Sequence, residues 1–194
     1  MSWKLKQNRN QKNRGKLLMS YFLVDVEADG PIPGQDDYSM VCFGAILFDK
    51  ERKFDTTFYG ETAPISKNWD PEALAISGFS REMHQTFEEP KLVMEKFKTW
   101  VLINSKGRPI FLADNNGFDF MYMHWYFEHF FGKRQDPFGW SSRNLTDIYH
   151  GITGDMYSSI RPLRKATHDH NPVSDSLGNA QAFATMVDAM GLKI

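Results

Sequence analysis

An apolar β-type run that carries two carboxylates constrains this chain more than any other feature. The run is Tyr21-Phe22-Leu23-Val24-Asp25-Val26-Glu27, and its apolar start is typical of a strand buried on both faces. Asp25 and Glu27 are two residues apart, so in a strand they project from the same face. Two such acids repel each other and lose hydration, and a divalent metal ion is the usual compensation. The alternative is a solvated strand end, because Asp-x-Glu triplets also arise by chance.

The rest of the chain predicts strands first and then helices alternating with strands. Further strands are expected at 40–48, 54–59, 109–113 and 144–148, and helices from 71, over 90–103, over 117–131 and over 172–190. Asp70-Pro71 and Asn171-Pro172 each place a helix-capping residue before a proline, which is typical of a helix start. This order predicts an α/β fold with a mixed sheet of about five strands flanked by helices.

Length and charge predict one domain preceded by a basic arm. The chain has 194 residues and 41% apolar residues, enough for one core. We expect residues 1–18 to form a disordered basic arm and residues 19–194 to form the domain. Without the six basic residues of the arm, 17 basic residues face 24 acidic ones, a net charge of −7. A body this acidic argues against a duplex-DNA binder held by many phosphate contacts, unless bound cations offset the carboxylates.

Cysteine content and hydropathy indicate the compartment. Cys42 is the single cysteine, so an intrachain disulfide and a zinc–thiolate site are both excluded. No apolar run approaches the ~20 residues that span a membrane. The sequence therefore predicts a soluble, cytoplasmic protein.

Two later segments place further polar groups at predicted helix starts. Asp119, in Asn116-Gly117-Phe118-Asp119, falls in the first turn of a helix that follows a short strand. The alternative interpretation is an acid favoured there by the helix dipole. Asp114 competes with Asp119 for a functional role, although we interpret it as a turn residue.

The last segment is His168-Asp169-His170-Asn171-Pro172-Val173-Ser174-Asp175. Its cap signal places His170 just before the last helix and Asp175 in the first turn, so both can point to the same place above the sheet. Histidine is the side chain best suited to accept a proton near neutral pH. The alternative is a surface loop with two polar histidines.

In this order, the Asp-x-Glu strand, the Asn-x-Phe-Asp helix start and the His-x4-Asp helix start resemble the DEDDh exonucleases. This superfamily contains polymerase proofreading subunits, oligoribonuclease and RNase T, and the resemblance runs from Tyr21 to about Met190. The chain differs from many relatives at Ala28-Asp29-Gly30, where they have Thr-Thr-Gly or Met-Thr-Gly. It also has Ser77-Gly78-Phe79 in place of a His-Gly-Ile-type turn.

The resemblance implies a ribonuclease H-like fold and a metal-dependent 3′→5′ exonuclease. It implies that Asp25, Glu27, Asp119 and Asp175 hold two Mg²⁺ ions, for which Mn²⁺ can substitute. It also implies that His170 is the general base that accepts a proton from the attacking water. The implied substrates are 3′ ends of single-stranded DNA or RNA, and the implied products are nucleoside 5′-monophosphates. Because relatives are often homodimers, a homodimer is an expected assembly.

Two alternatives remain open at this stage. One is an RNase T-like exoribonuclease, because no motif reads the 2′-hydroxyl that distinguishes RNA from DNA. The other is a catalytically inactive nucleic-acid-binding domain, although all five positions of the motif are intact. Most aromatic residues of 118–131 are expected in the core, with one or two available to stack on bases. Basic residues of 133–165, including Arg161 and Arg164, are candidates for phosphate contacts or for an ordinary solvated face.

Overall fold

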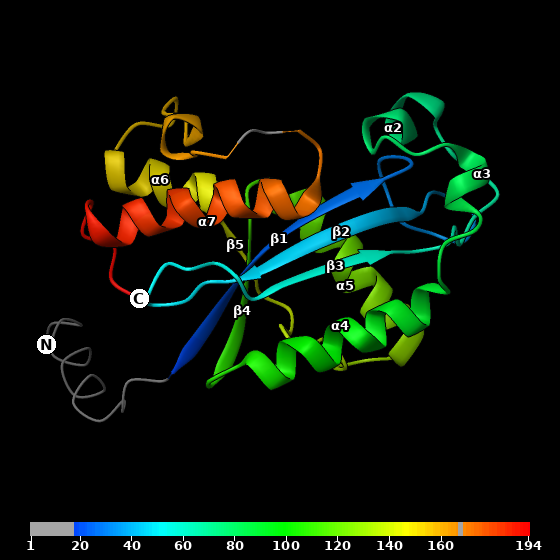
Figure 1. Cartoon of the computed structure of the whole chain (residues 1–194), viewed down its shortest axis with the longest axis horizontal. Helices are drawn as coiled ribbons and strands as arrows, with labels where there is room; N and C mark the ends of the chain where they lie inside the picture. Colours follow the sequence, from blue (N-terminus) through cyan, green and yellow to red (C-terminus); the bar gives the residue numbers. More distant parts are fainter. Residues whose placement is uncertain (1–17, 167–168) are drawn as a thin grey trace, which may run out of the picture.

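A five-stranded mixed sheet with the order β3-β2-β1-β4-β5 forms the centre of the protein (Figure 1). The strand that carries Asp25 and Glu27 lies in the middle, antiparallel to β2 and parallel to β4. This confirms the predicted mixed sheet and its central strand. The strands are β1 (Met19–Ala28), β2 (Met40–Leu47), β3 (Thr57–Glu61), β4 (Arg108–Ala113) and β5 (Arg143–Asn144).

The computed structural model describes residues 18–166 and 169–194. The predicted arm therefore lies outside the described residues except for Leu18, and it stays a prediction. His168 of the last sequence segment also lies outside them. Within the described part of the chain, no helix is both long and apolar enough to cross a membrane.

Helices cover both faces of the sheet (Figure 1). On one face, α4 (Pro90–Asn104) and α5 (Asn116–Phe131) pack on Phe22 and Val24 of β1. On the other face, α6 (Leu145–Thr153) and α7 (Pro172–Asp188) pack with Leu23. Because side chains alternate along a strand, Asp25 and Glu27 share the face of Leu23 and point toward α7. The short helices α2 (Pro71–Ile76) and α3 (Arg81–His84) lie at the carboxyl end of β1.

The predicted strand over Asn144–Ile148 is wrong. Only Arg143 and Asn144 pair with β4, and α6 begins at Leu145. The Asn144 side chain accepts a hydrogen bond from the main-chain amide of Asp147, which makes Asn144 a helix cap. Leu145, Ile148 and Ile152 then recur at helical spacing and pack in the core beneath α7. The sequence thus indicates apolar residues at these positions, but their spacing is that of a helix and not of the predicted strand.

The third strand begins later than predicted, and two short elements were not predicted. Asp49 accepts hydrogen bonds from the main-chain amides of Lys53 and Phe54, and Phe54 has a positive φ of 53°. This tight turn keeps 54–56 out of the sheet, so β3 starts at Thr57. The unpredicted elements are α3 and the 3₁₀ turn Arg161–Leu163. The N-capped helices at Pro71 and Pro172 begin where the sequence places them.

Candidate active site

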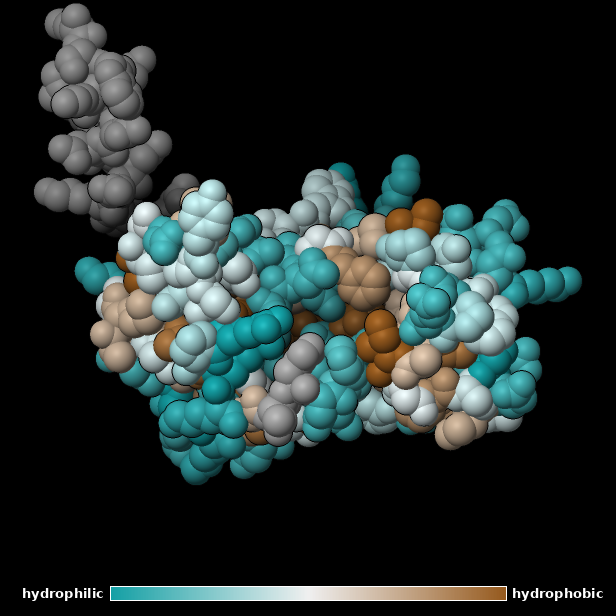
Figure 2. Space-filling view, turned by 90° about the horizontal axis from the view of Figure 1, so that it is seen from above, coloured by the Kyte–Doolittle hydropathy of each residue, from teal (hydrophilic) through white to brown (hydrophobic). Residues whose placement is uncertain are grey.

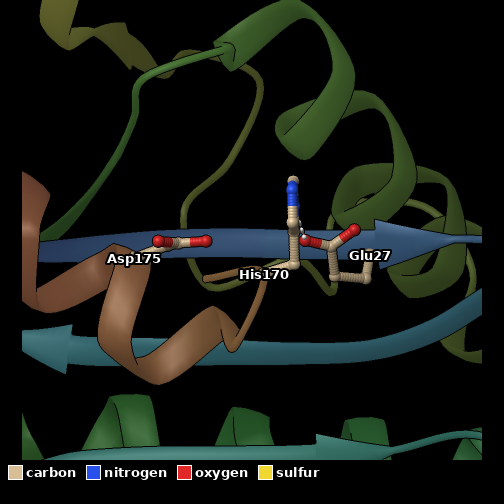
Figure 3. Close-up of side chains that lie close together, drawn as sticks. All are labelled: Glu27, His170 and Asp175. Carbon is tan, nitrogen blue, oxygen red and sulfur yellow. Dashed lines mark ion pairs between the residues drawn. The ribbon is translucent and has the colours of Figure 1, made fainter. Parts of the chain in front are cut away.

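Glu27, His170 and Asp175 converge from β1 and from the start of α7 (Figure 3). One ligand-type atom of each residue lies within 4.8 Å of the others. His170 Nδ1 lies 3.4 Å from Glu27 Oε1. Asp175 is 2% exposed, whereas the His170 side chain is 47% exposed. Glu27 is therefore flanked by a buried carboxylate and by a histidine at the protein surface. A proton that this histidine accepts can pass to solvent.

Asp25 lies beside this group, and its surroundings strongly disfavour the ionised form of its carboxyl group. Burial, and then repulsion by Asp119, Glu27 and Asp175, raise the pKa of Asp25 well above its usual range. Arg164 acts in the opposite direction but is the smaller influence. Since like charges this close disfavour full ionisation, a cation bound among the four carboxyl groups would relieve the repulsion between them.

The start of α5 brings Asp119 to the same strand. The main-chain amide of Val26 donates a hydrogen bond to Asp119 Oδ1 at 3.0 Å. The pairing between β1 and β4 ends at Leu23 and Leu112, so this carboxylate takes the place of a strand partner. Asp119 is 3% exposed, and burial raises its pKa well above the usual range.

Local backbone geometry at the start of α7 aims His170 and Asp175. His170 has a φ of 59°, in the left-handed region that a non-glycine residue adopts at a cost. Asn171 then caps the helix by accepting hydrogen bonds from the amides of Val173 and Ser174. Asp175 follows in the first turn, as the sequence predicts, with its amide bonded to the carbonyl of Asn171.

A buried polar network next to Glu27 was missed from the sequence. Asp29 is fully buried, and its Oδ2 lies 2.8 Å from Arg81 Nη1 and 3.7 Å from His84 Nδ1. Arg81 Nη2 also donates to the carbonyl oxygen of Ser66 at 2.8 Å. The network ties the end of β1 to α3. The Asp29 that departs from the family pattern was the available signal, but its partners are about 50 residues away along the chain.

Asp114 has a structural partner instead of a place among the ion-binding candidates. One of its carboxylate oxygens accepts a hydrogen bond from Thr146 Oγ1 at 2.7 Å, and the other forms an ion pair with Arg164. This supports the interpretation of Asp114 as a turn residue. Arg164 is thereby held near the carboxylates and is not part of a freely solvated basic face.

The donor set suits a hard divalent cation. Asp25, Glu27, Asp119 and Asp175 offer carboxylate oxygens, the ligands that Mg²⁺ and Mn²⁺ prefer. Among the residues that the structure describes, Glu27, His170 and Asp175 form the group whose donor atoms are close enough for a shared ion. The raised pKa of Asp25 has the same origin, crowded carboxylates that a cation would relieve.

The surface around the site is hollowed and partly apolar. Figure 2 shows hydrophobic surface gathered in a hollow between the side that carries α6 and α7 and the side that carries α2 and α3. The carboxyl end of β1 lies between the same two sides in Figure 1. On α5, Tyr122, Tyr126 and Phe127 are fully buried, while Phe118 is partly exposed next to Asp119. Three of the eight aromatic residues of the helix are thus buried in the core, and the other five are partly exposed and pack against it, so fewer are fully buried than predicted.

Comparison with known proteins relates this geometry to nucleases. No protein-family model matches the sequence. The chain is 28% identical over 181 residues to the 3′-5′ DNA exonuclease Cap18 of Escherichia coli. That match covers 88% of this chain and 92% of the relative.

Solved structures show the same fold. The nuclease domain of 3′hExo, a DEDDh family member bound to rAMP, matches with a TM-score of 0.72 and 15% identity, covering 94% of this chain and 98% of that one. A complex of E. coli exonuclease I with single-stranded DNA matches with a TM-score of 0.64 and 18% identity. This match covers 88% of the chain but only 41% of exonuclease I, so the chain spans less than half of that enzyme. The ribonuclease H-like exonuclease fold predicted from the sequence is confirmed.

Proposed function

We propose that this chain is a DEDDh-type 3′→5′ exonuclease, a metal-dependent enzyme that shortens single-stranded DNA from its 3′ end. The observation that carries the proposal is the convergence of Glu27, His170 and Asp175 within 4.8 Å, beside the crowded carboxyl group of Asp25. The products would be nucleoside 5′-monophosphates.

Four acids would hold the metal ions. Asp25, Glu27, Asp119 and Asp175 supply carboxylate oxygens from β1, α5 and α7. Two divalent ions, Mg²⁺ first and Mn²⁺ as a substitute, would supply positive charge that stabilises the attacking and leaving oxygens of phosphodiester cleavage. The raised pKa of Asp25 supports this assignment, because burial and the neighbouring carboxylates disfavour its ionised form when no cation is bound.

His170 would accept the proton from the water that attacks phosphorus. Attack forms a new bond from phosphorus to oxygen and breaks the bond to the 3′-oxygen of the preceding nucleotide, which leaves and takes up a proton. Glu27 Oε1, 3.4 Å from His170 Nδ1, would stabilise the charged imidazolium that results. The exposed side of His170 would then release the proton to solvent.

Two observations favour a single-stranded substrate, and a third favours DNA over RNA. The net charge of −7 outside the first 18 residues argues against a grip on duplex DNA by many phosphate contacts. The hollow beside the carboxyl end of β1 offers apolar surface, which suits unstacked bases. The relative at 28% identity is named as a DNA exonuclease, whereas the RNA-related structures are about 15% identical. RNA ends are the second candidate, because 3′hExo has this fold with rAMP bound.

The test is digestion of matched oligonucleotides. Single-stranded DNA, duplex DNA and single-stranded RNA of the same sequence, labelled at the 5′ end, are incubated with Mg²⁺ or with a chelator. We expect a descending ladder from single-stranded DNA with Mg²⁺ and none with the chelator or with Asp25→Asn. Faster loss of RNA would favour the exoribonuclease. No cleavage of any substrate would overturn the proposal. Sedimentation of the same preparation measures the expected homodimer.

A further inference from the structure

Gly44 of β2 lies opposite Asp25 in the sheet. The two residues are Cα partners in the antiparallel register, and Gly44 also pairs with Tyr59 of β3. Paired residues of neighbouring strands project from the same face. The position that a side chain of Gly44 would occupy is therefore on the Asp25 face of the sheet, beneath α7.

The backbone of α7 occupies this position. A Cβ atom added to Gly44 would lie 2.5 Å from the main-chain nitrogen of Val173 and 2.6 Å from the carbonyl oxygen of Pro172. Non-bonded carbon atoms do not approach backbone atoms so closely. The clash would be with the first turn of a helix and not with the end of a flexible side chain, so relief requires the helix to move.

A hydrogen bond holds the helix on the same residue. Ser176 Oγ donates to the carbonyl oxygen of Gly44 at 3.2 Å, and Ser176 is fully buried. The turn of α7 that touches Gly44 is the turn that contains Asp175, and His170 precedes it by two residues. A shift of this turn would therefore move His170 and Asp175 together, while Asp25 and Glu27 stay with β1.

We propose that Gly44 is a positioning residue that sets the distance between α7 and β1 and so assembles the ion-binding and proton-accepting groups. The inference rests on the proposed function, which assigns ion binding and proton transfer to that site. Because Gly44 has no side chain, α7 can approach the sheet closely enough for donor atoms of Asp175, His170 and Glu27 to lie within 4.8 Å.

Gly60 provides a matched control. It lies on β3, and an added Cβ would lie 2.7 Å from Val93 Cγ1 and 2.9 Å from Phe43 Cε1. These neighbours belong to the core on the α4 side, away from α7. Gly60→Ala thus inserts the same methyl group into the same sheet but on the other face. We expect both alanine variants to melt at lower temperature than the wild type.

The discriminating measurements are ion binding and turnover. For each protein, the rise in melting temperature is recorded against Mn²⁺ concentration, and single-turnover cleavage of single-stranded DNA is followed at saturating Mn²⁺. We expect Gly44→Ala to need at least about tenfold more Mn²⁺ and to cleave roughly 10–100-fold more slowly, since displacements near 1 Å have effects of this size. Gly60→Ala should match the wild type in both.

Each outcome decides the inference. If Gly44→Ala keeps the Mn²⁺ response and the turnover of the wild type, or if Gly60→Ala loses as much, Gly44 has no positioning role. If Gly44→Ala does not fold, Ser176→Ala replaces it, and an unchanged Mn²⁺ response in that variant overturns the inference. A wild-type protein that binds Mn²⁺ but cleaves nothing would overturn the proposed function alone. A wild-type protein that binds no Mn²⁺ would overturn both.

Discussion

The main-chain amide of Val26 and the carboxylate of Asp119 are joined by a hydrogen bond of 3.0 Å, although 93 residues separate them along the chain. Val26 lies between Asp25 and Glu27, so this bond attaches the first turn of α5 to the strand at the site itself. Asp119 therefore has two separable properties. Its oxygen satisfies a buried amide, and on the proposal above its charge would contribute to cation binding.

Substitutions at Asp119 should separate these properties. Asparagine keeps an oxygen acceptor for Val26 but removes the charge, so Asp119→Asn should lose nuclease activity while the metal-free protein stays at least as stable as the wild type. Asp119→Ala leaves a buried donor without its acceptor, which costs about 1–3 kcal/mol. Urea unfolding in a chelator measures the difference. Equal stability of the Asn and Ala variants would show that the Val26 amide finds another acceptor.

His170→Ala should separate proton transfer from ion binding. Loss of the proton acceptor should lower turnover by roughly 10²–10⁴-fold, the usual range for a general base. All four carboxylates remain, so calorimetric Mg²⁺ affinity should stay close to that of the wild type, whereas Asp25→Asn should weaken it. The control is His129→Ala, on the exposed side of α5 against Trp125. If His170→Ala abolishes ion binding, the histidine is a ligand and not the base.

His84 should make stability depend on pH below neutrality. Burial and the neighbouring Arg81 guanidinium lower the pKa of His84 from 6.5 to about 4. Between these values the unfolded chain binds more protons than the folded protein, so the contribution of His84 is complete above pH 6.5 and is lost as pH falls toward 4. The loss is on the order of 2–3 kcal/mol.

The measurement is the free energy of unfolding of the wild type and of His84→Gln between pH 4 and 7.5 in a chelator. Asp29 faces His84, and burial raises the pKa of Asp29 to about 6, which opposes the effect in the absolute curve. The comparison therefore uses the difference in the free energy of unfolding between the two proteins. The wild type should gain stability relative to His84→Gln as pH rises. A pH-independent difference would mean that His84 has the same pKa in the folded and in the unfolded protein.

The ion pair of Asp29 and Arg81 should reveal itself by non-additivity. Arg81→Leu leaves the Asp29 carboxyl group buried without its cation and should cost about 3–5 kcal/mol. Adding Asp29→Asn removes the charge, so the double variant should be more stable than Arg81→Leu alone. Urea unfolding at neutral pH measures both. A double variant less stable than Arg81→Leu would show that the charge is not the source of the cost.

Local signals account for what the sequence predicted well. Asp70-Pro71 and Asn171-Pro172 place both helix starts because capping depends on adjacent residues. The apolar start of β1 predicted its central place because a strand covered on both faces excludes water along its whole length. The strand therefore predicts the positions of Asp25 and Glu27, and the helix start at Asn171-Pro172 predicts the position of Asp175.

Features that depend on distant partners were not predictable in the same way. Over so few residues, the spacing of Leu145 and Ile148 is compatible with a strand or a helix. The helix forms because both side chains then pack in the core against α7. The partners of Asp29, on α3, carry no local pattern that links them to β1. Likewise, Gly44 is one of 14 glycines, and only the position of α7 distinguishes it.

The order in which the site residues occur along the chain has a consequence during synthesis. Glu27 leaves the ribosome early, whereas His170 and Asp175 come with α7, after every strand has been made. A growing chain that stops before Pro172 lacks the helix that carries Asp175 to the sheet. If His170 and Asp175 act as proposed above, the nascent polypeptide, which emerges beside messenger RNA, has no nuclease activity until α7 docks on the sheet. On the same proposal, fragments that end before Pro172 are expected to leave nucleic acid uncut.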